Sequence, residues 1–492
     1  MKKHLSELLS VTVKQVHGKT DVWVTGFSSD SRQIKSDNMF FAIKGEQTDG
    51  NKFIQVAIKN GASVIVSEVP LEKALDAVYV QVTDIYQFMA ESSALFYDTN
   101  DPALTIIGVT GTNGKTTTAH FICEILKSFS IKTIFIGTTG IEICDKVFHT
   151  DYTTPPAYEL HRILREGIDL QASHVIMEVS SHALKYKRVW GLKFDAAVFT
   201  NLTHEHREIH PSMEDYFQTK LKLFSMLKVA GVGLTNADDK YGKQIIHECR
   251  NVKLYDYGHT ADKIKVVHLA YIEGTRSQSI VYEIGGIQYD FNIPMIGAYN
   301  AYNALAAAET LATLKFDRKK IHNAFMSIPP VAGRLEWFNI GEIKAIIDFA
   351  HTPDGLDKLI KAVREIRKNN AKIITIFGCP GSRDISKRPL MGKIAVELSD
   401  YVIVTTDDIH FENPDKIIRD IVKDLEKTNL ETVTDRREAI ARALQIAKKG
   451  DFLLIAGRGH EKYQYVKNRK IPFLDKDVLF EEAEKAGLWI QK

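Results

Sequence analysis

Residues Thr105–Thr118 read TIIGVTGTNGKTTT, and this stretch decides the fold of the chain. An apolar run rich in β-branched residues precedes the glycine loop Gly111–Thr116, and a helical pattern follows it. The predicted apolar face of that helix consists of Phe121, Ile122, Ile125, Leu126 and Phe129. Glycines let backbone N–H groups converge on an anion, and the start of the helix adds partial positive charge. The stretch therefore predicts a phosphate-binding loop.

The side chains of the loop fit this interpretation. Lys115 would reach the outer phosphates of a nucleotide, and the Thr116 hydroxyl would ligate Mg²⁺. The spacing GxxGKT is two residues shorter than the usual GxxxxGKS/T motif. A glycine turn that opens an ordinary helix is the alternative, but the Lys-Thr pair in register favours nucleotide binding.

The composition is that of a globular protein without a strong charge bias. A chain of 492 residues is too long for one core and suggests about three domains. The net charge of +2 argues against a nucleic-acid-binding surface and against a polybasic membrane surface. No apolar run approaches the roughly 18–20 residues that span a bilayer, and the first residues lack the apolar centre of a signal peptide. Four cysteines without CxxC spacing fit a reducing cytoplasm, where we expect the protein to reside.

Strand and helix patterns alternate through three segments of the chain. Residues 1–100 contain short strands, residues 101–330 begin with the phosphate loop, and residues 331–492 repeat the alternation after Pro329-Pro330. In the central segment the strand candidates are Thr133–Ile136, His174–Val179, Ala196–Thr200 and Val232–Thr235. This alternation predicts an α/β fold with mostly parallel sheets, and a doubly wound, Rossmann-like arrangement in the last segment.

Polar side chains follow several of the predicted strands. Glu178 and the run Ser180–His182 follow one strand, residues 200–206 (TNLTHEH) follow the next, and Thr153–Pro155 follow a predicted hairpin. At the carboxyl edge of a parallel sheet these groups could complete a Mg²⁺ shell beside the phosphate loop; satisfied structural residues are the alternative. The cluster Ser29–Arg32 could hold a nucleotide or a sugar phosphate, although a solvated turn is the favoured interpretation.

Six motifs in order along the chain resemble the Mur ligases: TGTNGKTTT, EVSSHALKYKRV, TNLTHEH, DFAHTPDGL, GSRDISKRPLMGKIA and AGRGHEKYQ. These ATP-dependent, amide-forming enzymes build the stem peptide of peptidoglycan. The last three motifs resemble the MurE type, the UDP-N-acetylmuramoyl-tripeptide synthetases. The resemblance implies a UDP-sugar-binding domain at 1–100, a P-loop ATPase-like domain at 101–330 and an amino-acid-binding, Rossmann-like domain at 331–492.

The resemblance also assigns residues to ATP and two Mg²⁺ ions. The implied ATP-binding residues are Gly111, Thr112, Asn113, Gly114, Lys115, Thr116 and Thr117, with Asn300 and Asn303 on the adenine side and Arg334 and Asp348 across the domain join. The implied metal ligands are Thr116, Glu178, His206 and, if it is carbamylated, Lys220. Without the resemblance, Lys220 reads as a surface lysine on a helix.

Two further residue sets would hold the substrates. The implied positions for the UDP-sugar dipeptide are Ser29, Ser31, Thr153, Thr154, Ser180, Tyr186 and Arg188. The implied positions for the free amino acid are Arg383, Asp407, Asp408, His410, Gly457 and Glu461. Tyr152 and Tyr186 depart from the Asn and Gln that many members carry there, so individual hydrogen bonds differ.

The loop 407–410 bears on the identity of the amino acid. Family members that use meso-diaminopimelate read Asp-Asn-Pro-Arg here, whereas this chain reads Asp407-Asp408-Ile409-His410. A carboxylate in place of the bidentate cation would repel a second carboxylate and attract a terminal ammonium. We therefore expect L-lysine or ornithine, with meso-diaminopimelate as the alternative because His410 can still donate a hydrogen bond to a carboxylate.

The expected reaction transfers the γ-phosphoryl group of ATP to the D-glutamate carboxylate of UDP-N-acetylmuramoyl-L-alanyl-D-glutamate, and the amine of the third residue then displaces phosphate. The residues expected to act in catalysis are Lys115, Lys220, His206 and His351, the last two as candidate bases. We expect the last domain to close onto the central one. We also expect a monomer that binds the acceptor and a free amino acid, with no nucleic acid and no membrane insertion.

Three alternatives differ in class. Folylpolyglutamate synthase shares the short phosphate loop but does not account for the N-terminal segment or for the DFAHTPDGL motif. A nucleotide-dependent switch would need base-reading and switch motifs, which the sequence lacks. A Mur-like ligase recruited to another pathway stays open because of the unusual 407–410 loop.

Overall fold

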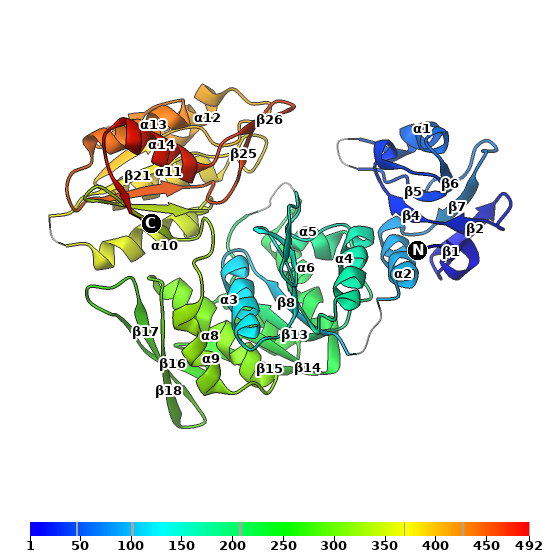
Figure 1. Cartoon of the computed structure of the whole chain (residues 1–492), viewed down its shortest axis with the longest axis horizontal. Coiled ribbons are helices and arrows are strands. Elements are labelled where there is room, and N and C mark those ends of the chain that lie inside the picture. The colour runs from blue at the N-terminus through cyan, green and yellow to red at the C-terminus, as the bar shows by residue number, and fades with distance from the viewer. Residues whose placement is uncertain (46–47, 100–102, 206–208, 369, 426–427, 492) are drawn as a thin grey trace.

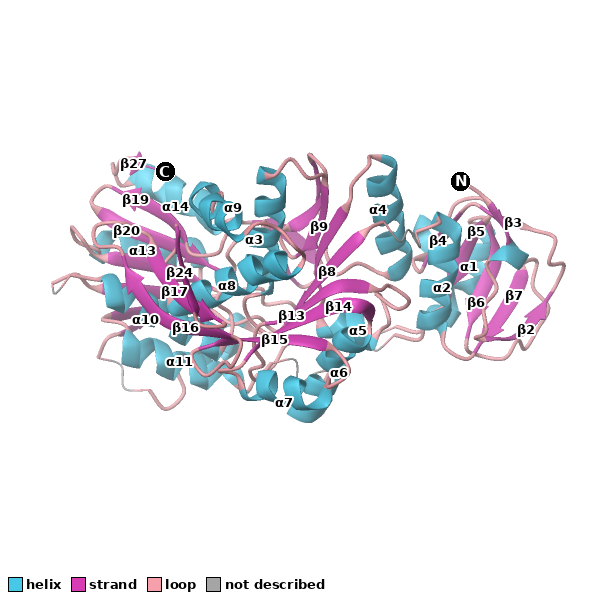
Figure 2. Cartoon of the chain, turned by 90° about the horizontal axis from the view of Figure 1, so that it is seen from below, coloured by secondary structure: helices cyan, strands magenta, loops and turns pink. Residues whose placement is uncertain are grey.

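The computed structural model describes residues 1–45, 48–99, 103–205, 209–368, 370–425 and 428–491 (Figure 1). Three sheets lie in a row, with the sheet of the N-terminal residues at one end, the largest sheet in the middle and the C-terminal sheet at the other end (Figures 1 and 2). His206, a predicted metal ligand and candidate base, lies outside the described residues. Among the described residues, no helix is long and apolar enough to cross a membrane.

The N-terminal sheet has five strands in the order β2-β7-β6-β5-β4. Its elements are β2 (Val13–His17), β4 (Gly26–Ser28), β5 (Asn38–Phe41), β6 (Ala62–Ser67), β7 (Val78–Val82), α1 (Ile54–Lys59) and α2 (Ile85–Tyr97), beside the short pair β1 (Lys3–His4) and β3 (Trp23–Val24). The pairs β4–β5, β5–β6 and β6–β7 are parallel, and β2 is antiparallel to β7. Buried aromatic rings such as Phe41, Phe88 and Phe96 fill the space between this sheet and α2.

The central sheet has eleven strands in the order β11-β10-β9-β12-β8-β13-β14-β15-β16-β17-β18. The strands are β8 (Thr105–Thr110), β9 (Thr133–Gly137), β10 (Gly140–Ile143), β11 (Lys146–Phe148), β12 (His174–Glu178), β13 (Phe194–Phe199), β14 (Leu227–Asn236), β15 (Lys253–Gly258), β16 (Ile264–Tyr271), β17 (Gln278–Ile284) and β18 (Ile287–Ile293). The helices are α3 (Lys115–Ser128), α4 (Ala157–Asp169), α5 (Ser181–Lys185), α6 (Met213–Ser225), α7 (Lys240–Glu248), α8 (Ala298–Thr313) and α9 (Arg318–Ala324). Strands β9 to β16 of this order pair in parallel, so their carboxyl ends share one edge of the sheet.

The C-terminal sheet has seven strands in the order β23-β22-β21-β24-β20-β19-β27. The elements are β19 (Glu336–Ile340), β20 (Ile343–Asp348), β21 (Ile373–Phe377), β22 (Tyr401–Val404), β23 (Leu430–Thr432), β24 (Phe452–Ala456), β27 (Ile490–Gln491), α10 (Pro353–Ile366), α11 (Lys387–Leu398), α12 (Pro414–Ile421), α13 (Arg436–Ile446) and α14 (Asp475–Lys485). A separate hairpin, β25 (Tyr463–Val466) with β26 (Arg469–Pro472), stands outside this sheet.

The predicted α/β fold with mostly parallel sheets is confirmed, and the four predicted central strands correspond to β9, β12, β13 and β14. One detail of the prediction for the helix after the phosphate loop, α3, is wrong. Phe129 lies beyond the end of α3 as its C-cap, because the chain turns there and Ser130 adopts a positive φ of 61°. The Phe129 ring is still partly buried and stacks on Phe316 at 6.0 Å. The antiparallel strands β16–β18 and the hairpin β25–β26 had no predicted counterpart.

A fully buried ion pair ties the last two helices to the C-terminal sheet. The Arg436 guanidinium donates to Asp475 from Nε (2.7 Å) and from Nη2 (2.8 Å), and neither side chain is exposed. Nη2 also donates to the carbonyl of Ala456 at the end of β24, and Nη1 to that of Thr406. Arg436 therefore holds α13, α14 and two loops at the carboxyl edge of the sheet in one arrangement.

We expect Arg436→Met to lower the free energy of unfolding by about 3–5 kcal/mol, because it leaves the buried Asp475 carboxylate without its counter-charge. The neighbouring Arg437 bonds Glu481 and Glu482 at the surface, so Arg437→Met should cost about 1 kcal/mol or less. Urea denaturation of both variants measures the difference. Equal losses in the two variants would contradict this account of the buried pair.

Candidate active site

The phosphate loop follows β8 and opens α3 as predicted. Gly114 is the N-cap of α3 and adopts a φ of +88°, a conformation that L side chains rarely adopt. A Cβ at this position would lie 2.3 Å from Oδ1 of Asn303 in α8. The loop is fixed from the next strand as well, because the backbone N–H groups of Thr112 and Asn113 donate to the carbonyl and side chain of Asn201.

Two lysines meet at the carbonyl of Gly111. Lys115 Nζ donates to Gly111 O (3.0 Å) and to Thr112 O (2.8 Å), and Lys220 Nζ donates to Gly111 O (2.8 Å). The Lys220 ammonium also lies 4.7 Å from the centre of the Tyr216 ring. Burial lowers the pKa of Lys115, and burial together with the charge of Lys115 lowers the pKa of Lys220 well below its ordinary value. Lys220 is thus a buried lysine at the loop rather than a surface lysine.

Glu178 lies at the end of β12 beside the first turn of α3. Its carboxylate accepts a hydrogen bond from the Thr116 hydroxyl (2.9 Å) and from the backbone N–H of Thr138 (2.8 Å). Arg334, from the start of the C-terminal segment, donates to the same Thr116 hydroxyl at 3.2 Å. A buried carboxylate and a hydroxyl in this place are hard oxygen donors of the kind that Mg²⁺ prefers.

A cleft of about 720 Å³ lies between the central and C-terminal parts of the molecule and is lined by residues of both. The predicted residues that line it are Thr112, Asn113, Gly114, Lys115, Thr116, Thr153, Glu178, Ser180, Arg188, Arg334, His351, Arg383, Asp407, Asp408, His410, Gly457 and Glu461. The predicted residues that do not line it are Ser29, Ser31, Gly111, Thr117, Thr154, Tyr186, Lys220, Asn300, Asn303 and Asp348. The phosphate loop and the amino-acid residues, more than 250 residues apart in the sequence, therefore face one cavity.

Several predicted residues outside the cleft support it from behind. Asn300 donates to Ile296 O, and Asn303 lies against Gly114, both deep in the fold. Asp348 accepts from the backbone N–H of Leu335 at 2.7 Å, and burial raises the pKa of its carboxyl. Ser29 faces Tyr158 of α4 at 3.4 Å, where the N-terminal part meets the central part.

Besides the bond from Arg334 to Thr116, several hydrogen bonds cross from the central to the C-terminal part, and three of them involve Asn113, His460 and His351. Asn113 Nδ2 donates to Asp354 Oδ2 at 2.8 Å. His460 Nε2 donates to Thr138 O at 3.0 Å, which places the proton on Nε2, and burial lowers the pKa of His460 to about 4. His351 Nε2 lies 2.9 Å from Glu205 Oε1. These contacts hold the central and C-terminal parts together beside the cleft.

His351 is occupied on both ring nitrogens. Nδ1 lies 2.8 Å from the carbonyl oxygen of Phe349, which can only accept, and Nε2 faces the Glu205 carboxylate. Both ring nitrogens are therefore engaged by groups of the protein itself. This favours His351 as a bridge between the two parts over His351 as a proton acceptor.

Two of the residues predicted to bind the UDP-sugar dipeptide form a hydrogen-bonded group next to Glu178. The Thr154 hydroxyl donates to the Glu178 carbonyl at 2.7 Å, and Arg188 Nη1 donates to the Thr154 carbonyl at 2.6 Å. The guanidinium of Arg188 also lies 4.9 Å from the centre of the Tyr152 ring. Tyr152, the departure noted in the sequence, therefore packs on a cation.

The loop 407–410 is organised by Arg458, whose side chain is 0% exposed. Its Nη1 bonds Asp408 Oδ1 and lies 3.3 Å from Asp407 Oδ1, and its Nη2 donates to Tyr463 O at 2.6 Å. Oxygens of Asp407, Asp408 and Glu461 lie within 4.8 Å of one another, a spacing that would suit a cation. The guanidinium already supplies a cation to this group. Burial and the charge of Asp407 raise the pKa of Glu461 to about 8.

Comparison with known families decides the identity of this arrangement. The Mur ligase middle domain matches residues 109–311, the Mur ligase glutamate ligase domain matches residues 333–459, and the Mur ligase family catalytic domain matches residues 24–97. The chain belongs to the Mur ligase family. It is an ATP-dependent ligase that forms amide bonds.

Two curated relatives of this Mur ligase and one solved structure share a name. A protein from Clostridium tetani named UDP-N-acetylmuramoyl-L-alanyl-D-glutamate–2,6-diaminopimelate ligase is 37% identical over 95% of the chain and 96% of the relative. A protein of the same name from Aquifex aeolicus is 38% identical over 93% of both. A solved structure with this name superposes with a TM-score of 0.68 at 28% identity and covers 99% of the chain and 100% of the solved one. Folylpolyglutamate synthase from Mycobacterium tuberculosis, at 14% identity and a TM-score of 0.59, covers 72% of this chain and 88% of its own and shares only the fold.

Sequence reasoning about this Mur ligase missed Thr138, Glu205, Arg458 and His460. Arg458 and His460 stand inside the quoted GRGHE motif, so the motif was the available signal. Thr138 follows β9 at the same sheet edge as Glu178, and that shared edge was the signal for it. Glu205 stands inside the quoted TNLTHEH motif, but nothing in the sequence indicated its contact with His351, because only the fold brings the two together.

We expect Gly114→Ala to weaken ATP binding at least about tenfold, because the added Cβ would push the phosphate loop away from Asn303. Gly191→Ala is the matched control, since Gly191 also has a positive φ (+84°) but nothing lies within 4 Å of its Cβ position. Calorimetric titration with a non-hydrolysable ATP analogue measures both affinities. An equal effect of the two substitutions would show that general backbone strain, not the contact with Asn303, is responsible.

Proposed function

We propose that this Mur ligase attaches a diamino acid to UDP-N-acetylmuramoyl-L-alanyl-D-glutamate in peptidoglycan precursor synthesis, with meso-diaminopimelate as the amino acid. The single observation that carries the proposal is the shared cleft. The phosphate loop, the 407–410 loop and the residues Thr153, Ser180 and Arg188 all line this one space. The names of the relatives support the substrate. They favour diaminopimelate over the lysine or ornithine expected from the sequence.

The 407–410 loop is compatible with this choice. The expectation of lysine rested on Asp408 as an uncompensated carboxylate that would repel a second carboxylate. Arg458 bonds Asp408 directly, and Tyr465 N donates to the same oxygen at 3.1 Å. Arg383 and His410 face the same cleft and can interact with a distal carboxylate, while Glu461 can pair with an ammonium.

The proposed roles of the three parts follow from the positions of the sheets. Residues 1–100 would bind the UDP-sugar, residues 101–330 would bind ATP, and residues 331–492 would bind the amino acid. The five-, eleven- and seven-stranded sheets lie within these three ranges, which supports the division.

In the proposed reaction a D-glutamate carboxylate oxygen takes the γ-phosphoryl group of ATP, which releases ADP and leaves an acyl phosphate. The amine of the third residue attacks the acyl carbon, and phosphate leaves as the amide forms. Lys115 and the loop N–H groups would stabilise charge on the transferred phosphoryl group. Thr116 and Glu178 would hold Mg²⁺, which neutralises phosphate charge when bound.

Lys220 is the proposed site of carbamylation. A lysine reacts with carbon dioxide as the neutral amine, and its lowered pKa favours that form. The carbamate would add a carboxylate to the oxygen donors Thr116 and Glu178. Lys220 in its unmodified form donates to Gly111 O beside Lys115, so the modification would replace a repulsive charge with an attractive one.

Product analysis tests the proposal. The pure protein is incubated with ATP, Mg²⁺, the dipeptide acceptor and, in separate reactions, meso-diaminopimelate, L-lysine or ornithine. We expect the diaminopimelate tripeptide by mass spectrometry, together with ADP and phosphate that form only when acceptor and amino acid are both present. Faster turnover with lysine or ornithine would overturn the amino-acid assignment, and no tripeptide with any of the three would overturn the function.

The raised pKa of Glu461 predicts a pH dependence. A carboxyl group with a pKa of about 8 is mostly neutral at pH 7 and ionised at higher pH, and only the ionised form attracts the ammonium of the amino acid. The KM for the amino acid should therefore fall as the pH rises through about 8. Glu461→Gln should abolish this fall and raise the KM about tenfold at the higher pH.

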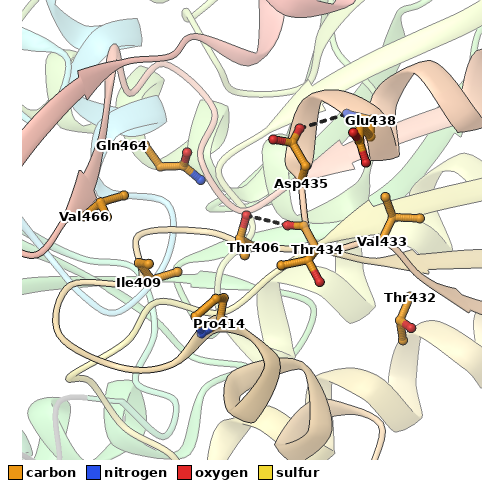
Figure 3. A pocket seen from close by; sticks show the side chains of 10 residues that line it. All are labelled: Thr406, Ile409, Pro414, Thr432, Val433, Thr434, Asp435, Glu438, Gln464 and Val466. Carbon is orange, nitrogen blue, oxygen red and sulfur yellow. Dashed lines mark hydrogen bonds between the residues drawn. The ribbon is translucent and has the colours of Figure 1, made fainter.

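Glu438→Gln is the matched control for that measurement, because Glu438 is an exposed carboxylate that lines a separate cavity together with Thr406 and Ile409 (Figure 3) and does not line the cleft. Its KM profile should follow that of the unmodified protein. A Glu461→Gln profile that still fell with pH would assign the titration to another group.

A further inference from the structure

The hairpin β25–β26 forms one wall of the amino-acid part of the cleft. Along β25, Tyr463 and Tyr465 line the cleft, whereas Gln464 and Val466 line a second cavity of about 600 Å³ on the outer side. In residues 406–410, Asp407, Asp408 and His410 line the cleft. Thr406 and Ile409 line the outer cavity, as Figure 3 shows. A single layer of chain therefore separates the amino-acid site from the outer cavity.

The hairpin holds the 407–410 loop by backbone contacts. His410 N donates to Tyr465 O at 2.9 Å, and Lys467 N donates to His410 O at 2.6 Å. Gln464 Nε2 donates to Asp407 O at 3.0 Å, and the His410 and Tyr465 rings stack at 5.7 Å. His410 adopts a positive φ of 48°, which is costly for a residue with a Cβ, so these contacts determine its conformation.

The hairpin itself needs external support. Its two strands pair with each other, and a single bridge joins Val466 to His410 of the loop that the hairpin holds. Isolated two-stranded hairpins are marginally stable in water. Arg458 and the Phe473 N–H to Lys462 O bond (2.9 Å) fix its base. The far strand, β26, is exposed along its whole length.

One contact fixes that far strand to the central part of the molecule. Lys470 Nζ donates to Asp151 Oδ1 at 2.9 Å, across 319 residues of sequence. Asp151 directly precedes Tyr152, Thr153 and Thr154, which lie beside Arg188 and Glu178. The ion pair thus connects the acceptor side of the cleft to the wall that shapes the amino-acid side.

We propose that Lys470 and Asp151 form a latch that positions the hairpin and, through it, the 407–410 loop for the incoming amino acid. Both are positioning residues, because they act through the hairpin and not on a reacting atom. The inference rests on the proposed function, since it assigns the amino acid to the 407–410 loop. It goes further by naming what shapes that loop when the two parts close.

The test is a charge swap measured by steady-state kinetics on the full chain, with the acceptor dipeptide, ATP and the amino acid that the unmodified protein uses. Lys470→Glu and Asp151→Lys should each raise the KM for the amino acid about three- to tenfold, with little change in kcat or in the KM for ATP. The double variant Lys470→Glu/Asp151→Lys should restore the KM to within about twofold, because it re-forms the pair in reverse. A structural defect would not be rescued in this way.

Arg469→Glu is the matched control, since Arg469 lies on the same strand, is exposed, and as the preceding residue faces the opposite side. It should leave all three constants unchanged. Lys470→Met removes the charge without reversing it. It should also raise the KM for the amino acid, and it replaces Lys470→Glu if the charge-reversed protein fails to fold.

Unchanged amino-acid KM in the single variants, or no recovery in the double variant, would overturn the latch. The unmodified protein reports separately on the proposed function. If it forms no tripeptide, that function is refuted; if it forms tripeptide and the variants match it, only the latch is refuted.

Discussion

The hydrogen bond from Arg334 to the Thr116 hydroxyl links the C-terminal part of the molecule to the phosphate loop. Arg334 lies two residues before β19, the strand with which the chain enters the C-terminal sheet. Thr116 lies in the first turn of α3. The half-buried guanidinium lies over the Phe349 ring at 4.5 Å, and the charge of the Asp348 carboxylate acts on it favourably. Its bond to Thr116 brings the start of the C-terminal part against the phosphate loop, and Arg334 lines the cleft between the two parts.

Parallel strands then determine where the reacting groups gather. Loop residues follow β8, Glu178 and Asp348 end β12 and β20, and Gly457 follows β24. In each sheet these positions lie at the carboxyl edge, where backbone N–H groups and helix starts face outward. The phosphate loop at one edge and Gly457 at the other line the same cleft.

The sequence was informative where the chemistry is local. A strand, a glycine loop with Lys115 and Thr116, and an amphipathic helix form a pattern within fourteen residues, and the structure places them as that pattern predicts. Periodicity shows which face of an element is buried, but it does not identify the partner across the fold. Glu205 and His351 are 146 residues apart, and Asp408 and Arg458 are 50 apart, so neither pair was predictable. The expectation of lysine from Asp408 is not confirmed, and the names of the relatives favour diaminopimelate. The sequence showed the charge of Asp408 but not its counter-charge, Arg458.

The 407–410 loop can vary because it lies outside the core of the C-terminal sheet. It is held by Arg458 and by the hairpin β25–β26, and neither belongs to a strand of the seven-stranded sheet. A substitution in this loop changes the charge that faces the cleft and leaves the buried pair of Arg436 with Asp475 intact, because that pair fixes the start of α13 and the end of β24 instead. The proposed amino-acid site and the C-terminal sheet thus rest on two different guanidinium networks, that of Arg458 and that of Arg436. Because the Arg458 network compensates Asp408 locally, the loop can read Asp-Asp-Ile-His while the phosphate loop and the sheet edges stay unchanged.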